Sequence, residues 1–167
     1  SGGTVSLLRM VPIGRLLSSV LADAPLLAAL PKDGPTLIRC ESGQRWEWDG
    51  VVFSLLHPTP AEYADPRVKT NDLSCVLRID SPHGSALLTG DIEAVSEGSL
   101  LDREAARLGA DVLVVPHHGS RSSSTPAFVA AVAPQVAVFT PGYRNRYGHP
   151  RPEIVARYAR SQTWRTD

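Results

Sequence analysis

The chain has 167 residues, of which 43% are hydrophobic and 20% are charged, a composition that is ordinary for a soluble globular protein. Its 17 basic and 17 acidic side chains cancel, so no global positive field indicates a nucleic-acid partner, and such binding has to come from a local patch. No apolar run reaches the roughly 18–20 residues that a membrane helix needs and no signal peptide is recognisable, so we expect one soluble domain over residues 1–167.

The expected elements change character along the chain, with strands and hairpins first and β-α units later. In the first part we expect helices at 6–10 and 24–30, then strands at 36–40, 45–48, 51–56, 73–80 and 85–89, with a surface loop over 57–72. In the second part we expect helices at 98–108, 125–132 and 152–160, alternating with buried strands at 112–115 and 136–140. This order predicts a mixed sheet with helices on its outer faces.

The chain has two cysteines, Cys40 and Cys75, which are too few for a disulfide framework or a zinc ribbon. Both lie in strand-like runs, so we expect buried free thiols. A single bridge is the alternative if the compartment is oxidising.

Three polar loops directly follow apolar strands, where an α/β sheet usually has its active site. They contain Asp91, the pair His117 and His118, and His149. Taken singly, each has a structural alternative, such as a helix cap for the aspartate. Together, one carboxylate and up to three imidazoles are a nitrogen-rich donor set that suits a divalent metal. We expect a metal ion held by these donors to polarise a phosphoryl or carbonyl oxygen and to convert bound water into hydroxide near neutral pH.

The second loop continues through serines into a helix that begins near Thr125-Pro126. Free amides at this helix start, together with Ser120, Arg121 and Ser122, predict a phosphate cradle. An ordinary Ser/Thr cap followed by a mobile serine loop is the alternative.

For the other histidines and for two tryptophans, the sequence favours roles outside the candidate site. His57 ends a strand, where a structural role is favoured over a place in the site, and His83 is expected to be solvated in a turn. Trp46 and Trp48 alternate in a strand, so packing on one face is favoured over base stacking.

Four motifs in this order resemble the C-terminal domain of the ComEC family of DNA-uptake proteins. They are Asn71-Asp72-Leu73-Ser74-Cys75-Val76-Leu77-Arg78-Ile79, Leu88-Thr89-Gly90-Asp91, Val115-Pro116-His117-His118-Gly119-Ser120 and Asn145-Arg146-Tyr147-Gly148-His149-Pro150. The resemblance implies a metallo-β-lactamase fold, an α/β (α+β) sandwich of four αββα layers. It also implies a role in importing transforming DNA across the inner membrane and in degrading the strand that does not enter.

The resemblance also implies residue roles. Asp91 is expected to bridge two metal ions, His117 to be the next ligand, and His118 and His149 to be further ligands or catalytic groups. We therefore expect Asp91, His117 and His118 to be catalytic, and Asp91, His117 and His149 to bind zinc or manganese. Substrate-binding roles are assigned to Ser120, Arg121, Ser122, Asn145 and Arg146.

One motif of the superfamily, His-x-His-x-Asp-His, does not occur in the chain, and Ser1-Gly2-Gly3 resembles the residues just after it. We therefore expect a fold that is incomplete in its N-terminal half, with metal absent or weakly bound and no activity in this fragment. The family pattern also leads us to expect a further strand after Asp167.

The function favoured by these observations is a metal-dependent nuclease that degrades the non-transported strand in natural transformation. The alternatives are a non-catalytic DNA-binding module and a hydrolase of another phosphoester or ester. The expected partners are single-stranded DNA and the membrane-embedded channel part of the parent protein, with no small-molecule organic cofactor. The expected location is a soluble domain of an inner-membrane protein that faces the periplasm.

Overall fold

The computed structural model describes residues 2–20, 27 and 34–167, and the chain divides into two compact units, 1–40 and 41–167. In the first unit, α1 (Gly2–Met10) precedes the parallel strands β1 (Arg15–Ser18) and β2 (Thr36–Arg39). The helix expected at 6–10 and the strand at 36–40 are present, whereas the helix expected at 24–30 lies outside the described residues apart from position 27. The interpretation of the chain as one domain stays a prediction.

The second unit is built on one mixed sheet of seven strands that follow one another in chain order. Its antiparallel half contains β3 (Arg45–Trp48), β4 (Val51–His57), β5 (Val76–Ser81) and β6 (Gly84–Leu88). Its other half adds β7 (Val112–Val114), β8 (Val136–Phe139) and β9 (Gln162–Arg165), all parallel to β6. The predicted mixed α/β fold is confirmed.

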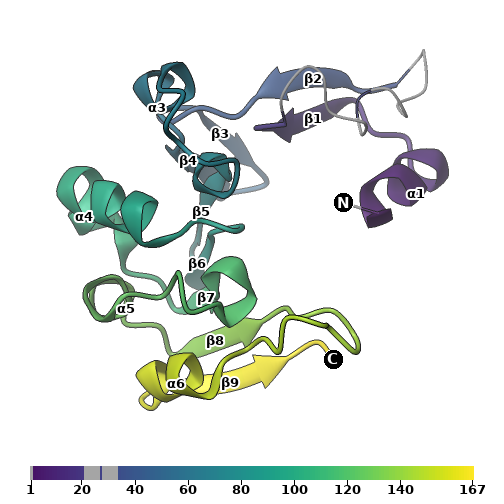
Figure 1. The fold of residues 1–167 in the computed structure, drawn as a ribbon. Coiled ribbons are helices and arrows are strands. Elements are labelled where there is room, and N and C mark those ends of the chain that lie inside the picture. Colours follow the sequence, from purple (N-terminus) through teal and green to yellow (C-terminus); the bar gives the residue numbers. More distant parts are fainter. Residues whose placement is uncertain (1, 21–26, 28–33) are drawn as a thin grey trace. The chain divides into compact units, whose positions relative to one another are not determined.

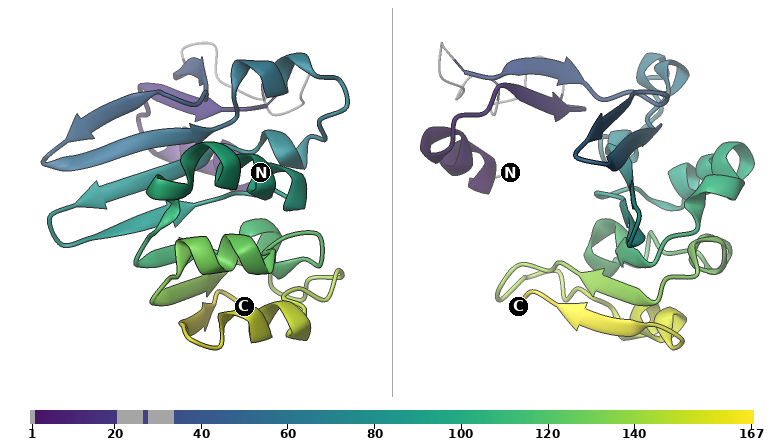
Figure 2. Two further views of the ribbon diagram at one scale, coloured as in Figure 1. Left: turned by 90° about the vertical axis from the view of Figure 1, so that its left-hand side faces the viewer. Right: turned by 180° about the vertical axis from the view of Figure 1, so that it is seen from behind.

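The main helices lie along one face of this sheet (Figures 1 and 2). They are α4 (Ala94–Leu108), α5 (Pro126–Val132) and α6 (Pro152–Val155), the last continued by the 3-10 helix η3 (Ala156–Tyr158). Their apolar side chains meet those of the central strands in a core whose fully buried members include Leu87, Leu100, Leu113, Phe128 and Phe139. In the described part of the chain, no helix has both the length and the apolar character to span a membrane.

One expectation about local structure was wrong, and one strand was not predicted. The stretch 57–72 is not only a loop, since it contains α3 (Pro60–Ala64) and leads into the 3-10 helix η1 (Asn71–Leu73). A capping box between Thr59 and Glu62 starts α3, with proline at its first turn. The C-terminal strand β9 was not predicted, because its four residues are all exposed and show no burial pattern.

The expectation of free thiols was also wrong. Both Cys40 and Cys75 are disulfide-bonded, which is the alternative that depends on an oxidising compartment.

The parallel half of the sheet determines where the candidate residues lie. Because β6, β7 and β8 run in the same direction, their carboxyl ends share one edge of the sheet. The three loops singled out in the sequence all begin at this edge.

Candidate active site

The loop after β6 is fixed by the short motif that precedes β5. The backbone N–H of Asp91 donates to the Ser74 hydroxyl (3.1 Å), and that of Glu93 donates to a carboxylate oxygen of Asp72 (3.0 Å). Gly90 has a φ of +57°, and a Cβ there would lie 2.8 Å from the Ser74 Cβ. This motif therefore positions the Asp91 loop.

The loop after β7 begins with an unusual run of backbone conformations. His117, His118 and Gly119 have φ values of +48°, +56° and +83°, so two consecutive non-glycine residues are left-handed. Such residues cost on the order of 1–3 kcal/mol each and cluster at functional sites. The His117 N–H donates to the Gly90 carbonyl (2.9 Å), which links this loop to the Asp91 loop.

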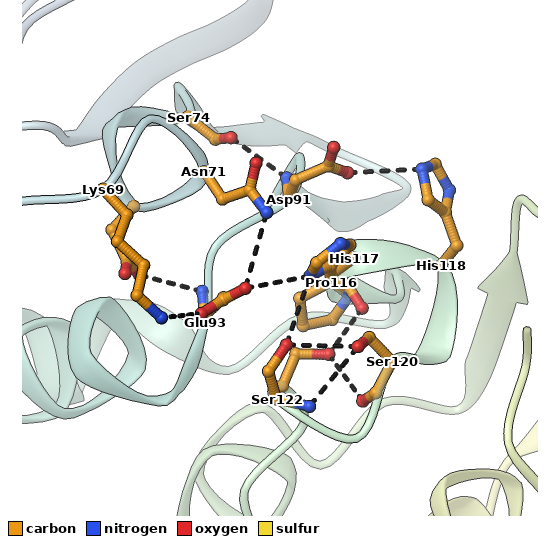
Figure 3. A network of polar contacts seen from close by, with 12 residues as sticks. Lys69, Asn71, Ser74, Asp91, Glu93, Pro116, His117, His118, Ser120 and Ser122 are labelled. Carbon is orange, nitrogen blue, oxygen red and sulfur yellow. Dashed lines mark hydrogen bonds and ion pairs between the residues drawn. The ribbon is translucent and has the colours of Figure 1, made fainter. Parts of the chain in front are cut away.

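His118 and Asp91 form the first of two histidine–carboxylate pairs (Figure 3). The His118 Nε2 lies 3.3 Å from the Asp91 Oδ1, and both side chains are 42% exposed. The other ring nitrogen, Nδ1, lies 3.1 Å from the Thr140 hydroxyl just beyond β8. Both ring nitrogens thus contact protein groups, while the side chain remains partly exposed.

His117 and Glu93 form the second pair (Figure 3). The His117 Nδ1 lies 3.5 Å from the Glu93 Oε1 and 3.3 Å from the Ser122 hydroxyl. Lys69 Nζ contacts the other Glu93 oxygen at 2.9 Å, and this hydrogen bond holds the pKa of Glu93 below its ordinary value. Asn71 also donates to this carboxylate. The sequence interpretation missed Glu93, although a second acid two positions after the predicted carboxylate was a usable signal.

His149 joins the group from the loop after β8. Its ring centroid is 5.9 Å from that of His117, and Tyr147 stacks on the His149 ring with a centroid distance of 5.9 Å. Its Nδ1 is buried without a hydrogen-bond partner in the described structure. Burial lowers the pKa of His149, and the neighbouring His117 lowers it further, so the ring is neutral at neutral pH. A neutral imidazole with an unpaired nitrogen suits a ligand-binding role.

These side chains meet the chemical requirements of a metal site only in part. Carboxylate and imidazole donors suit zinc or manganese. Within the described residues, however, no three His, Cys, Asp or Glu side chains converge to hold a metal ion. The donors meet as pairs, and a complete site needs further ligands.

The serine loop after the histidines forms hydrogen bonds both within itself and to neighbouring elements. The hydroxyls of Ser120 and Ser122 lie 3.1 Å apart, and Arg121 pairs with Glu153 at 2.5 Å. The Arg121 side chain is 70% exposed, so its charge faces solvent but is already partnered.

The amides expected to be free at the start of α5 are occupied, so that part of the predicted cradle was wrong. The backbone N–H groups of Ser124 and Thr125 donate to the carboxylate of Glu97, the latter at 2.7 Å. Glu97 is fully buried, and this burial raises its pKa. Its carboxylate fills the position proposed for a phosphate. The sequence analysis missed this contact, because Glu97 lies just before the helix expected at 98–108 and its partners are about 27 positions further along the chain.

The remaining candidates separate into structural and exposed groups. Asn145 accepts from the His149 N–H and donates to its carbonyl, both at 2.9 Å, so it closes the loop, while Arg146 is exposed. His57 is fully buried and lies 2.7 Å from the Asp72 carbonyl, which confirms its structural role.

The two tryptophans differ from each other, because Trp46 stacks on Phe53 whereas Trp48 is 69% exposed. The expectation that both pack on one face was therefore wrong for Trp48.

Comparison with known sequences identifies relatives among competence proteins. The chain is 41% identical over 114 residues to Competence protein ComA of Neisseria gonorrhoeae, covering 68% of this chain and 16% of that protein. It is 35% identical over 122 residues to Recombination protein 2 of Haemophilus influenzae, covering 72% of this chain and 14% of that protein. It is 32% identical over 133 residues to ComE operon protein 3 of Bacillus subtilis, covering 80% of this chain and 16% of that protein. The matches therefore span only a small part of each relative, and no family model matches the chain.

Comparison with solved structures identifies the fold. The metallo-β-lactamase fold protein YhfI of Bacillus subtilis aligns with a TM-score of 0.55 at 12% identity, covering 99% of this chain and 68% of that one. A variant of the β-hydroxylase CmlA aligns with a TM-score of 0.53 at 12% identity, and the alignment covers 92% of this chain and 38% of that one. At these identities the likeness shows the fold alone, and that fold is the one expected from the motifs.

Proposed function

Because the chain belongs to the ComEC family of competence proteins, we propose that it is part of a metal-dependent nuclease that degrades the non-transported DNA strand during uptake. The observation that carries this proposal is the gathering of Asp91, His117, His118 and His149 at one edge of the sheet. Structural scaffolding alone does not call for three histidines and a carboxylate from three loops to lie beside one another, with two of the histidines in a left-handed backbone conformation.

Each residue has a chemical task under this proposal. A bound divalent ion would polarise a phosphoryl oxygen and supply hydroxide near neutral pH. Asp91, His117 and His149 would hold it together with a His-x-His-x-Asp-His segment, and Glu93 would orient His117 through its Nδ1. His118 would move a proton to or from the substrate, because its ring contacts Asp91 and remains accessible.

The cellular location and the partners are proposed from the family and from the two disulfide-bonded cysteines. Disulfide-bonded Cys40 and Cys75 favour an oxidising compartment, which supports a periplasmic domain of an inner-membrane protein. The partners would then be single-stranded DNA and the membrane-embedded channel part of the same protein.

A second candidate function is supported by one observation. In the part of the chain that the structure describes, no three ligands converge on a metal position. A domain that binds DNA and guides it to the channel without cutting it would have the same fold and need no such group.

The test is a cleavage assay on labelled single-stranded DNA with this chain joined to a His-x-His-x-Asp-His segment. We expect cleavage that requires manganese or zinc. Asp91→Ala and His117→Ala should each reduce it by about 100-fold or more, because each removes a ligand. His83→Ala, in an exposed turn, is the matched control and should leave the rate unchanged.

Two outcomes would contradict the nuclease. DNA binding without cleavage under any divalent metal would support the guiding module. Faster turnover of small phosphoesters or esters than of DNA would support a hydrolase of another substrate.

A further inference from the structure

We propose that the loop 142–151 is a platform on which the bases of single-stranded nucleic acid stack, with Tyr143 and Tyr147 as its stacking surfaces. The proposal rests on the proposed function only for its choice of a nucleic-acid substrate. Its physical basis is that the loop combines exposed aromatic rings, positive charge and an ordered backbone.

The first observation is the exposure of two aromatic rings. Tyr143 is 79% exposed and Tyr147 is 70% exposed, although both belong to a loop that is otherwise tied to the structure. A large ring left in water loses the burial that stabilises most aromatic side chains. Two such rings four residues apart indicate a surface that a planar partner covers.

The second observation is the local charge. Residues 142–151 contain Arg144, Arg146 and Arg151 and no aspartate or glutamate, in a chain whose charges cancel overall. The Arg144 guanidinium lies 5.2 Å from the centroid of the Tyr143 ring, a cation–π arrangement. This loop is therefore a local positive patch of the kind that binding to a phosphate backbone requires.

The third observation is that the loop is held in shape. The Asn145 side chain makes two hydrogen bonds to the backbone of His149, and its own N–H donates to the Gly142 carbonyl at 3.0 Å. Gly148, with a φ of +65°, allows the chain to turn between Asn145 and His149. A loop that is already ordered loses little conformational entropy when it binds a ligand.

The fourth observation connects the platform to the candidate active site. Tyr147 stacks on His149 with an interplanar angle of 14°, and the His149 ring lies 5.9 Å from that of His117. A strand whose bases cover the tyrosines would thus have its backbone beside the histidine group. Stacking on an aromatic side chain needs a base face that duplex DNA keeps covered, so the platform selects single strands.

The experiment measures binding of fluorescent oligonucleotides to this 167-residue chain by anisotropy. A dT oligonucleotide is compared with an abasic oligonucleotide of the same length, which keeps the phosphates and lacks the bases, and with a duplex. We expect dT to bind about 100-fold more tightly than the abasic strand, since each of the two stacked bases adds about tenfold. Tyr143→Leu and Tyr147→Leu should each reduce this preference about tenfold and leave abasic binding unchanged.

The arginines have a separate expected effect. Arg144→Gln and Arg146→Gln should weaken dT and abasic binding alike and each reduce the slope of log affinity against log salt by about 1. Arg121→Gln should have a smaller effect, because Glu153 already pairs with that guanidinium. Trp48→Leu, an exposed aromatic change in β3 at the far edge of the sheet, is the matched control and should change neither ligand's affinity.

Equal binding of dT and abasic strands, no binding of either, or no effect of the tyrosine variants would overturn the platform. Thermal melting of each variant shows that the chain remains folded. The cleavage assay separates the two proposals: cleavage that does not depend on the tyrosines would refute the platform alone. Tyrosine-dependent dT binding without cleavage would refute the nuclease alone.

Discussion

At the scale of single residues, Gly119 is a position where a side chain has no room. Its φ is +83°, and a Cβ there would lie 2.7 Å from the Pro150 Cβ and 3.0 Å from the Phe139 ring. We expect Gly119→Ala to lower the free energy of unfolding by about 3 kcal/mol, since the left-handed backbone costs about 1–3 kcal/mol and overpacking adds about 1–3 kcal/mol. Urea denaturation measures the loss.

Gly98 provides the matched control for this substitution. It lies inside α4, and a Cβ there meets nothing within 4 Å. Gly98→Ala should raise the free energy of unfolding by about 0.5–1 kcal/mol, because alanine restricts the unfolded chain and favours the helix. An unfolding midpoint for Gly119→Ala that matches the unsubstituted chain would show that the loop can rearrange at little cost.

The sequence predicts those candidate site residues that directly follow an apolar strand. Asp91, His117 and His149 each follow an apolar strand, and parallel strands bring such positions to one edge. Glu93 and Glu97 could not be found in this way. Their roles depend on partners brought close by the tertiary fold, namely His117 for one and the start of α5 for the other.

At the scale of elements, His57 connects the end of β4 to η1 and to α3. Its Nε2 lies 2.7 Å from the Asp72 carbonyl, and its Nδ1 lies 3.1 Å from Glu62. Burial lowers the pKa of His57, so the folded state keeps the ring neutral at neutral pH.

A pH dependence of stability follows from this lowered pKa. As pH falls through the ordinary histidine value of about 6.5, the unfolded chain binds a proton before the folded chain does. Stability contributed by the neutral ring is therefore present above that value and is lost as pH falls through the lowered pKa. We expect the melting temperature to decrease between pH 7.5 and pH 5, and His57→Gln to reduce this decrease.

His83 is the control for that measurement, because it is an exposed turn residue. His83→Gln should leave the pH dependence as it is in the unsubstituted chain. If His57→Gln does the same, the acid sensitivity originates elsewhere and the structural role given to the buried ring is wrong.

Element prediction succeeded where burial leaves a pattern and failed where it does not. The strands of the hairpin β3–β4 were predicted at 45–48 and 51–56, and they pair across the turn at Asp49-Gly50. β9 lies at the sheet edge with every residue exposed, so neither hydrophobic alternation nor an apolar run marks it. The helix α3 was missed although its capping box was visible, since the surrounding prolines favoured a loop.

At the scale of the whole molecule, the fold follows from the order of motifs, whereas the pairing of donors depends on how the loops meet in three dimensions. Hairpins followed by β-α units predict a mixed sheet, and that sheet brings the three loops together. Spacing alone does not reveal that His118 pairs with Asp91 and His117 with Glu93. These pairs matter for metal binding, because the potential donors meet two at a time and no described group of three converges.

Metal uptake by the chain follows from this arrangement. We expect the 167-residue chain to bind zinc weakly and below one equivalent, because a stable zinc site needs about four ligands in tetrahedral geometry. Zinc content after dialysis, with and without EDTA, measures this. Joining a His-x-His-x-Asp-His segment should raise the content to at least one equivalent. Asp91→Ala and His149→Ala should reduce it again, and His83→Ala should not. A stoichiometric, EDTA-resistant zinc ion in the chain alone would show that Asp91 and the histidines rearrange into a sufficient site without further ligands.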